Sequence, residues 1–296
     1  QKVTSWLSSQ GLHIDRVFAN RMTIEFSGNA GSVSAAFNTP IHFVRVSGKT
    51  HVAHMKDPEI PSALAPVVAG VVALHDFLPR SQARMRSQYT FGGCGGHCYA
   101  VTPPDLATIY NMNPLFKSHI TGKGQTIAVV EDSNLYSTND WTTFRSAFGL
   151  SSYLSGSLTQ IHPDCSDPGA GANDFEATLD AEYATAAAPD AAIIVASCQS
   201  YFTFGGLTAL QNLLNSGSLP SIVSISYGEC ESLNGPAANA AYNAAYQQAA
   251  SEGVSVFVSA GDEGAAGCDY LAKTATHGTN VNAMASTPYN VAVGGT

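Results

Sequence analysis

Four carboxylates stand within residues 174–182, although the whole chain of 296 residues holds only 22 aspartates and glutamates. Two of them, Glu176 and Asp180, are four residues apart, so a helix would place both on one face. Carboxylates that are held together and partly desolvated raise each other's pKa, which suits them to proton transfer. The alternative is a solvated acidic face, because acidic runs commonly lie at the surface.

Apolar residues of the same segment form a second stripe. We expect that stripe to face the core and to leave the acidic side available for chemistry. The stripe consists of Phe175, Leu179, Tyr183 and Ala186.

The charge is unevenly distributed along the chain. Residues 1–90 carry nine lysines and arginines against five acids, which gives +4, and residues 91–296 carry four against seventeen, which gives −13. Opposite charges predict that the two parts attract each other near neutral pH and less in acid, where carboxylates are neutralised. The sequence contains no dense basic run, so a nucleic-acid partner is not expected. It also contains no run of 18 apolar residues, so no membrane span is expected.

Strand and helix patterns alternate after residue 100. Short, continuously apolar runs joined by amphipathic segments predict an α/β fold with a doubly wound parallel sheet. The predicted strands are residues 126–130, 192–196, 222–225, 254–258 and 291–293.

The first 80 residues predict a separate, smaller α/β unit. Its expected elements are helices near residues 6–12 and 32–37, a strand at 22–26, a hairpin of 41–46 with 51–55, and apolar residues at helical spacing over 61–72. His51 and His54 lie in this hairpin and are interpreted as structural residues. We predict domains at 1–80 and 100–296, joined by a cleavable linker at 81–99 that lacks periodicity.

Acidic and polar residues follow several predicted strands. Ligands of parallel α/β sheets bind beyond the carboxyl ends of the strands, so these residues should gather at one edge. They are Glu131, the run Ser226, Tyr227 and Gly228, and Asp262.

Five segments in order together resemble the sedolisins, the kumamolisin-type serine-carboxyl peptidases. They are Gly124 to Glu131, the helix of Glu176 and Asp180 that ends at Pro189, Ser224 to Gly228, Ser259 to Asp262, and Pro288 to Thr296. The first part of the chain resembles the later portion of the pro-kumamolisin activation domain, so the chain looks truncated at both ends. The resemblance implies a subtilisin-like fold, here partial.

The resemblance also implies a role for each acid. Glu176 matches the general base that serves a serine nucleophile, and Asp180 matches the residue that orients this base. Asp262 matches the acid of the oxyanion hole, which must be protonated to donate a hydrogen bond. Glu131 fits an outer carboxylate of the proton network. Tyr227 stands where the family often has tryptophan, so the substrate-side wall formed by Ser226, Tyr227 and Gly228 is expected to differ here.

No serine of this sequence matches the Gly-Thr-Ser nucleophile segment of the family. That segment and a calcium-binding loop come later in family members, so a calcium site is expected in the full-length protein but not in this chain. The fragment alone is therefore expected to be inactive.

The six cysteines form an even set, which favours disulfides and an oxidising compartment. Cys94 and Cys98 could form a metal half-site or a tight disulfide loop, and no second pair with zinc spacing follows. Within the family framework we predict the pairs Cys94–Cys98, Cys165–Cys198 and Cys230–Cys268.

The leading hypothesis is a secreted endopeptidase zymogen that acts in acid, with peptide or protein substrates and its own prodomain as partners. The first residue is Gln1 rather than Met, which is consistent with a piece of a longer precursor. A non-catalytic secreted homologue that serves as a binding or structural module is the alternative. An aspartic-type hydrolase that uses Glu176 and Asp180 without a nucleophile is a third possibility.

Overall fold

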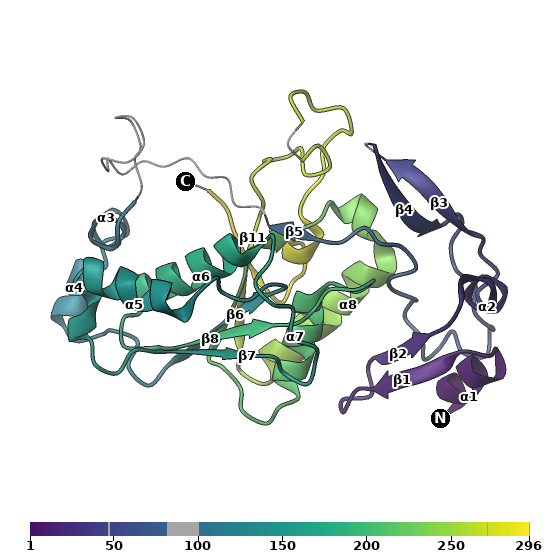
Figure 1. Ribbon diagram of the computed structural model, residues 1–296, viewed down its shortest axis with the longest axis horizontal. Coiled ribbons are helices and arrows are strands. Elements are labelled where there is room, and N and C mark those ends of the chain that lie inside the picture. The colour runs from purple at the N-terminus through teal and green to yellow at the C-terminus, as the bar shows by residue number, and fades with distance from the viewer. Residues whose placement is uncertain (47, 82–100, 271, 296) are drawn as a thin grey trace.

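The structure is a computed structural model that describes residues 1–46, 48–81, 101–270 and 272–295. The predicted linker 81–99, its cleavage site and the Cys94–Cys98 pair lie outside these residues, except for Ser81. Figure 1 shows a small N-terminal unit beside a larger layered one. Among the described residues, no helix combines the length and the apolar character needed to cross a membrane.

A six-stranded parallel sheet forms the centre of the larger unit, as the apolar runs predicted. Its strand order is β12-β11-β9-β6-β8-β7, and each neighbouring pair is parallel. The strands are β6 (Thr126–Glu131), β7 (Ser157–Ile161), β8 (Ala192–Ser197), β9 (Ile222–Ile225), β11 (Ser255–Ser259) and β12 (Val291–Val293). The edge strand β7 was missed, because its sequence has no continuous apolar run.

Helices cover both faces of this sheet (Figure 1). Alternate residues of β6 explain the layers: Ala128 and Val130 pack in a cluster with α7 and α8, whereas Ile127 and Val129 pack with α5 and α6. The helices are α3 (Pro103–Ile109), α4 (Asn113–Lys117), α5 (Thr138–Ala147), α6 (Asp174–Ala187), α7 (Gly205–Leu214) and α8 (Glu231–Ser251), with short 3₁₀ turns η1 (Leu150–Ser152) and η2 (Ala283–Ala285). α8 is kinked at Gly235, before Pro236.

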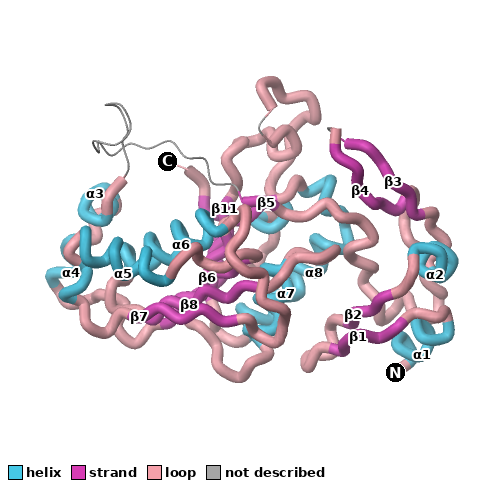
Figure 2. Tube along the Cα trace, viewed as in Figure 1, coloured by secondary structure: helices cyan, strands magenta, loops and turns pink. Residues whose placement is uncertain are grey.

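The N-terminal unit contains two small antiparallel ladders (Figure 2). Its elements are α1 (Lys2–Ser9), β1 (His13–Val17), β2 (Ile24–Ser27), α2 (Ala30–Ala36), β3 (Ile41–Val46) and β4 (Lys49–His54). The prediction of helical structure over 61–72 was wrong, because this segment forms turns and loop instead. It nevertheless buries Leu64, and Val71 packs against the core of the unit.

The N-terminal unit contacts the larger unit through both neutral and charged side chains. Asn20 donates to Gln248 at 3.0 Å, and the Arg16 guanidinium binds both the carboxylate and the backbone oxygen of Asp164. Asp164 remains largely exposed, so this ion pair is screened by solvent.

The chain then enters the larger unit through a two-residue strand, β5 (Arg80–Ser81). β5 pairs antiparallel with β10 (Tyr227–Gly228), opposing Ser81 to Tyr227 and Arg80 to Gly228. This strand was not predicted, since two residues carry no periodic pattern. The predicted domain boundary therefore coincides with a segment that is held by the larger unit.

Two predicted disulfides are present. Cys165–Cys198 joins the loop before α6 to the end of β8, and Cys230–Cys268 joins the start of α8 to the loop after β11. Both bridges tie loops at the carboxyl edge of the sheet to the scaffold, which restricts the segments that carry the candidate site.

Candidate active site

The acidic face of α6 points into the protein. Glu176 is only 3% exposed, and Ala177 and Ala181 beside it are fully buried. These small side chains allow α6 to lie close to the sheet. Phe175 is 44% exposed, so the predicted orientation of the apolar stripe was wrong for this residue. The alternative of a solvated acidic face is excluded.

The inward position places Asp180 against the end of β9. The hydroxyl of Ser226 donates to Asp180 Oδ2 at 2.7 Å. Burial raises the pKa of Asp180 to about 6, although hydrogen bonds from Ser226 and Glu131 lower it. Asp180 therefore titrates in mildly acidic solution, where the carboxyl group can both accept and release a proton.

Glu131 ends β6 and lies at the centre of the cluster. Its side chain is fully buried, and burial together with the charge of Asp180 raises its pKa well above the usual value. Within the described part of the chain, no group donates a hydrogen bond to Glu131 Oε1. A proton on Glu131 resolves this arrangement, because a carboxyl proton can be shared with Asp180 while two carboxylates would repel each other.

A buried tyrosine connects Glu131 to a further acid. The Tyr227 hydroxyl lies 2.8 Å from Glu131 Oε2 and 3.0 Å from Asp132 Oδ1. The hydroxyl has a single proton, so Tyr227 donates to one of these two carboxyl groups at a time and links Glu131 to Asp132. Asp132 also accepts from Asn173 and Ser200. The sequence placed Glu131 and Tyr227 at this edge but did not identify their link to Asp132.

Glu176 faces the segment that arrives from the N-terminal unit. The Ser81 hydroxyl donates a hydrogen bond to Glu176 Oε2, and the Tyr270 hydroxyl donates to the Ser81 carbonyl at 3.2 Å. A pocket of about 510 Å³ opens at this point. Its walls are formed by Pro79, Arg80, Ser81, Ala172, Asn173, Phe175, Glu176 and Tyr270.

The other predicted site residues lie at the same sheet edge. Tyr227 is fully buried, so its backbone rather than its side chain faces β5, and Gly228 pairs with Arg80. Asp262 is exposed in the loop that follows β11. Within the described part of the chain, no hydrogen bond joins Asp262 to the other carboxyls, and its oxyanion role stays a prediction.

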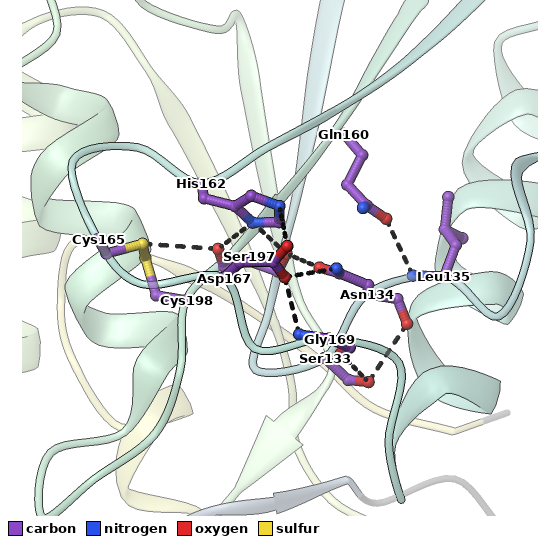
Figure 3. Close-up of polar contacts among 10 residues, drawn as sticks. All are labelled: Ser133, Asn134, Leu135, Gln160, His162, Cys165, Asp167, Gly169, Ser197 and Cys198. Carbon is purple, nitrogen blue, oxygen red and sulfur yellow. Dashed lines mark hydrogen bonds and ion pairs between the residues drawn. A yellow bond between two sulfur atoms is a disulfide. The ribbon is translucent and has the colours of Figure 1, made fainter.

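A second polar network fixes the loop that leads into α6, and Figure 3 shows it. His162 Nδ1 lies 3.2 Å from Ser197 Oγ, which donates to Asn134 Oδ1 at 2.7 Å. Asn134 in turn donates to Asp167 at 2.7 Å. The loop 162–171 is thus attached to the ends of both β6 and β8, and the Cys165–Cys198 bridge reinforces this attachment. The network positions the first turn of α6, where Glu176 lies.

No group of three or more histidines, cysteines or acids that could hold a metal ion occurs in residues 1–46, 48–81, 101–270 and 272–295. His51 binds Asp76 at 3.0 Å, and His54 contacts the Leu74 carbonyl, in keeping with structural roles. The calcium site expected in a full-length family member stays a prediction.

Comparison with known proteins adds an independent line of support. Residues 1–77 match the family model described as Pro-kumamolisin, activation domain. The chain is 30% identical to kumamolisin from Bacillus sp. (strain MN-32) over 313 aligned positions, which cover 100% of this chain and 53% of kumamolisin. The chain is homologous to kumamolisin, sedolisin and tripeptidyl-peptidase 1.

The other relatives show the same pattern. Identity to sedolisin from Pseudomonas sp. (strain 101) is 28%, covering 100% of this chain and 51% of sedolisin. Identity to tripeptidyl-peptidase 1 from Rattus norvegicus is 31%, covering 86% of this chain and 45% of that protein. The chain thus spans about half the length of these relatives.

A solved structure shares the fold. This is Pseudomonas sedolisin, a serine-carboxyl proteinase, in complex with two molecules of pseudo-iodotyrostatin. The match has a TM-score of 0.53 and 22% identity, and it covers 66% of this chain and 53% of the sedolisin chain. The predicted subtilisin-like α/β fold is therefore confirmed.

Proposed function

We propose that this chain contributes the activation prodomain and the carboxylate half of the active site to a secreted serine-carboxyl endopeptidase that works in acid. One observation carries the proposal: Glu176, Asp180 and Glu131 form a single buried carboxyl cluster at the carboxyl edge of the sheet. Homology to kumamolisin, sedolisin and tripeptidyl-peptidase 1 supports the peptidase class. The two disulfides favour an oxidising compartment outside the cytosol.

In this proposal Glu176 is the general base. Glu176 already accepts a hydrogen bond from an aliphatic alcohol, the hydroxyl of Ser81. A serine nucleophile in the same position would transfer its proton to this carboxylate as it attacks a peptide carbonyl. Asp180 and Glu131 are proposed to share a carboxyl proton next to Glu176 and so to set the pKa of this base. The nucleophile itself is expected from a segment that this sequence does not include.

Burial of these acids supports work in acid solution. The pKa of Asp180 rises to about 6 and that of Glu131 rises well above 4.5, in each case mainly because of burial. A carboxyl group whose pKa is raised by folding does not lower the free energy of unfolding below its unfolded pKa. Its destabilising effect grows as the pH rises from the unfolded pKa toward the folded pKa. The folded site is therefore favoured in mild acid and penalised toward neutral pH.

The path of the chain supports a zymogen. The Ser81 hydroxyl is hydrogen-bonded to the Glu176 carboxylate, and β5 is paired with β10. A substrate therefore cannot bind to this carboxylate or to the β10 backbone while the linker stays in place. The N-terminal unit and the linker are accordingly proposed to inhibit the site until they are released. Neutralisation of acids in the larger unit would weaken the attraction for the basic N-terminal unit.

Peptide hydrolysis by the full-length gene product tests the proposal. We expect activity between about pH 3 and 6 that Glu176→Ala and Asp180→Ala each lower by at least about a hundredfold. Glu252→Ala, at the exposed acid that follows α8, should keep normal activity. A folded protein that has lost its prodomain but shows no hydrolysis would instead indicate the non-catalytic module.

A further inference from the structure

The side chain of Arg80 in β5 lies against the larger unit and marks a candidate binding site there. β5 runs antiparallel to β10 as an extended peptide, with Arg80 opposite Gly228. The guanidinium carbon of Arg80 lies 5.8 Å from the centre of the Tyr270 ring. This distance is within the range at which an aromatic face attracts a cation. The hydroxyl of Tyr270 also holds the next carbonyl, that of Ser81, so the ring is fixed beside the peptide path.

An acid directly follows the residue that pairs with Arg80. Glu229 follows Gly228 directly and is partly buried, with Oε1 accepting from the Cys230 amide at 3.2 Å. Burial raises the pKa of Glu229 to about 7, and the attraction of Arg80 opposes this rise. Among the residues that the structure describes, Glu229 interacts electrostatically with Arg80 from β5 and with the buried Tyr242 from α8. Arg80 is the cation among these groups.

We propose that Glu229, Tyr270 and the backbone of Gly228 form a subsite for a cationic side chain of the peptide substrate, and that Arg80 occupies this subsite in the zymogen. The inference rests on the proposed peptidase function and gives it a substrate class: peptides with arginine or lysine at the residue that pairs with Gly228. A planar guanidinium suits both walls, because it can stack on a ring while it faces a carboxylate.

The subsite responds to pH in a defined direction. Because Arg80 opposes the rise in the pKa of Glu229, a cation binds more tightly when Glu229 is ionised. This attraction is present above pH 7 or so and is lost as the pH falls through the pKa, whereas the attraction of the Tyr270 ring persists. Acid therefore weakens the hold on Arg80 and helps the linker to leave.

Peptide binding tests the subsite without requiring hydrolysis. The probe is a dye-labelled peptide with the sequence of residues 76–81 and a blocked carboxyl end, and its partner is the full-length gene product after prodomain removal. A second probe carries citrulline in place of arginine, which keeps the shape and removes the charge. We expect fluorescence anisotropy at about pH 7.5 to give roughly tenfold tighter binding of the arginine peptide, and only about threefold at pH 4.5.

Matched variants assign this preference to its two walls. Glu229→Gln should remove most of the pH-dependent preference for the arginine peptide, and Tyr270→Leu should remove the preference that persists in acid. Glu252→Gln should change neither preference. Equal binding of the arginine and citrulline peptides by the wild type, or no binding of either, would overturn the subsite. Hydrolysis without an arginine preference would reject the subsite alone, whereas selective binding without hydrolysis would reject the peptidase function alone.

Discussion

Replacement of Glu131 by glutamine tests whether the centre of the carboxyl cluster carries a proton. Glutamine keeps the shape of a protonated glutamate and its ability to donate a hydrogen bond toward Asp180, but it cannot ionise. The usual pKa of this side chain is 4.5, and burial raises it well above that value. Wild-type protein should therefore take up a proton on folding as the pH approaches neutrality, and the variant should not.

The size of the effect follows from linkage. Keeping Glu131 protonated in the folded protein lowers the free energy of unfolding only above about pH 4.5, where this side chain would ionise in the unfolded chain. The destabilisation grows by about 1.4 kcal/mol per pH unit until the folded pKa is reached. The raised pKa therefore lowers the free energy of unfolding of the wild type progressively as the pH rises toward 7, by at most about 4 kcal/mol from this group. The stability of Glu131→Gln relative to the wild type should accordingly rise between about pH 4 and pH 7, by at most about 4 kcal/mol.

Urea unfolding followed by tryptophan fluorescence measures this difference. Each protein carries Glu176→Gln to prevent self-cleavage, and Glu252→Gln serves as a matched control that should show no such trend. Comparison of variants cancels the contributions of other acids with raised pKa values, such as Glu182 and Glu229. A constant difference across this pH range would refute the conclusion that burial raises the pKa of Glu131.

Three further changes test other parts of the structure. Tyr227→Phe removes the hydroxyl between Glu131 and Asp132 and should lower the free energy of unfolding by about 1.5–3 kcal/mol in a urea titration at pH 5; an unchanged midpoint would contradict those contacts. Arg145→Met leaves the backbone carbonyls that its guanidinium binds without a donor and should cost about 3–5 kcal/mol in the same assay, with less than 1 kcal/mol contradicting this role. The Asp269 carboxylate accepts hydrogen bonds from the backbone amides of residues 276 and 277, so Asp269→Asn should speed hydrogen exchange at these amides. Unaltered exchange would contradict a role of Asp269 in holding this loop.

Much of the scaffold could be predicted because it depends on local patterns. Continuous apolar runs such as Thr126–Glu131 fit only strands that are covered on both faces, and they gave the central sheet. The spacing of Glu176 and Asp180 placed both acids on one helical face. The pairs Cys165–Cys198 and Cys230–Cys268 followed from their places in the family framework.

The remaining features depend on packing between distant segments. The orientation predicted for Phe175 in α6 was wrong because alanines, rather than this larger side chain, pack beneath the acidic face. The contact between Ser81 and Glu176 joins residues 95 positions apart, and no local pattern marks it. Likewise, Asp132 becomes part of the cluster only because the tertiary fold brings the Tyr227 hydroxyl to it.

Self-cleavage of the full-length gene product tests the central claim most directly, because it requires no choice of substrate. Intact protein is moved from neutral solution to about pH 4, and the masses of the products are followed with time. We predict that the N-terminal unit is released from the wild type and from Glu252→Ala but is retained in Glu176→Ala and Asp180→Ala. Release at an equal rate in all four proteins would contradict the assignment of the buried carboxylate pair as catalytic machinery.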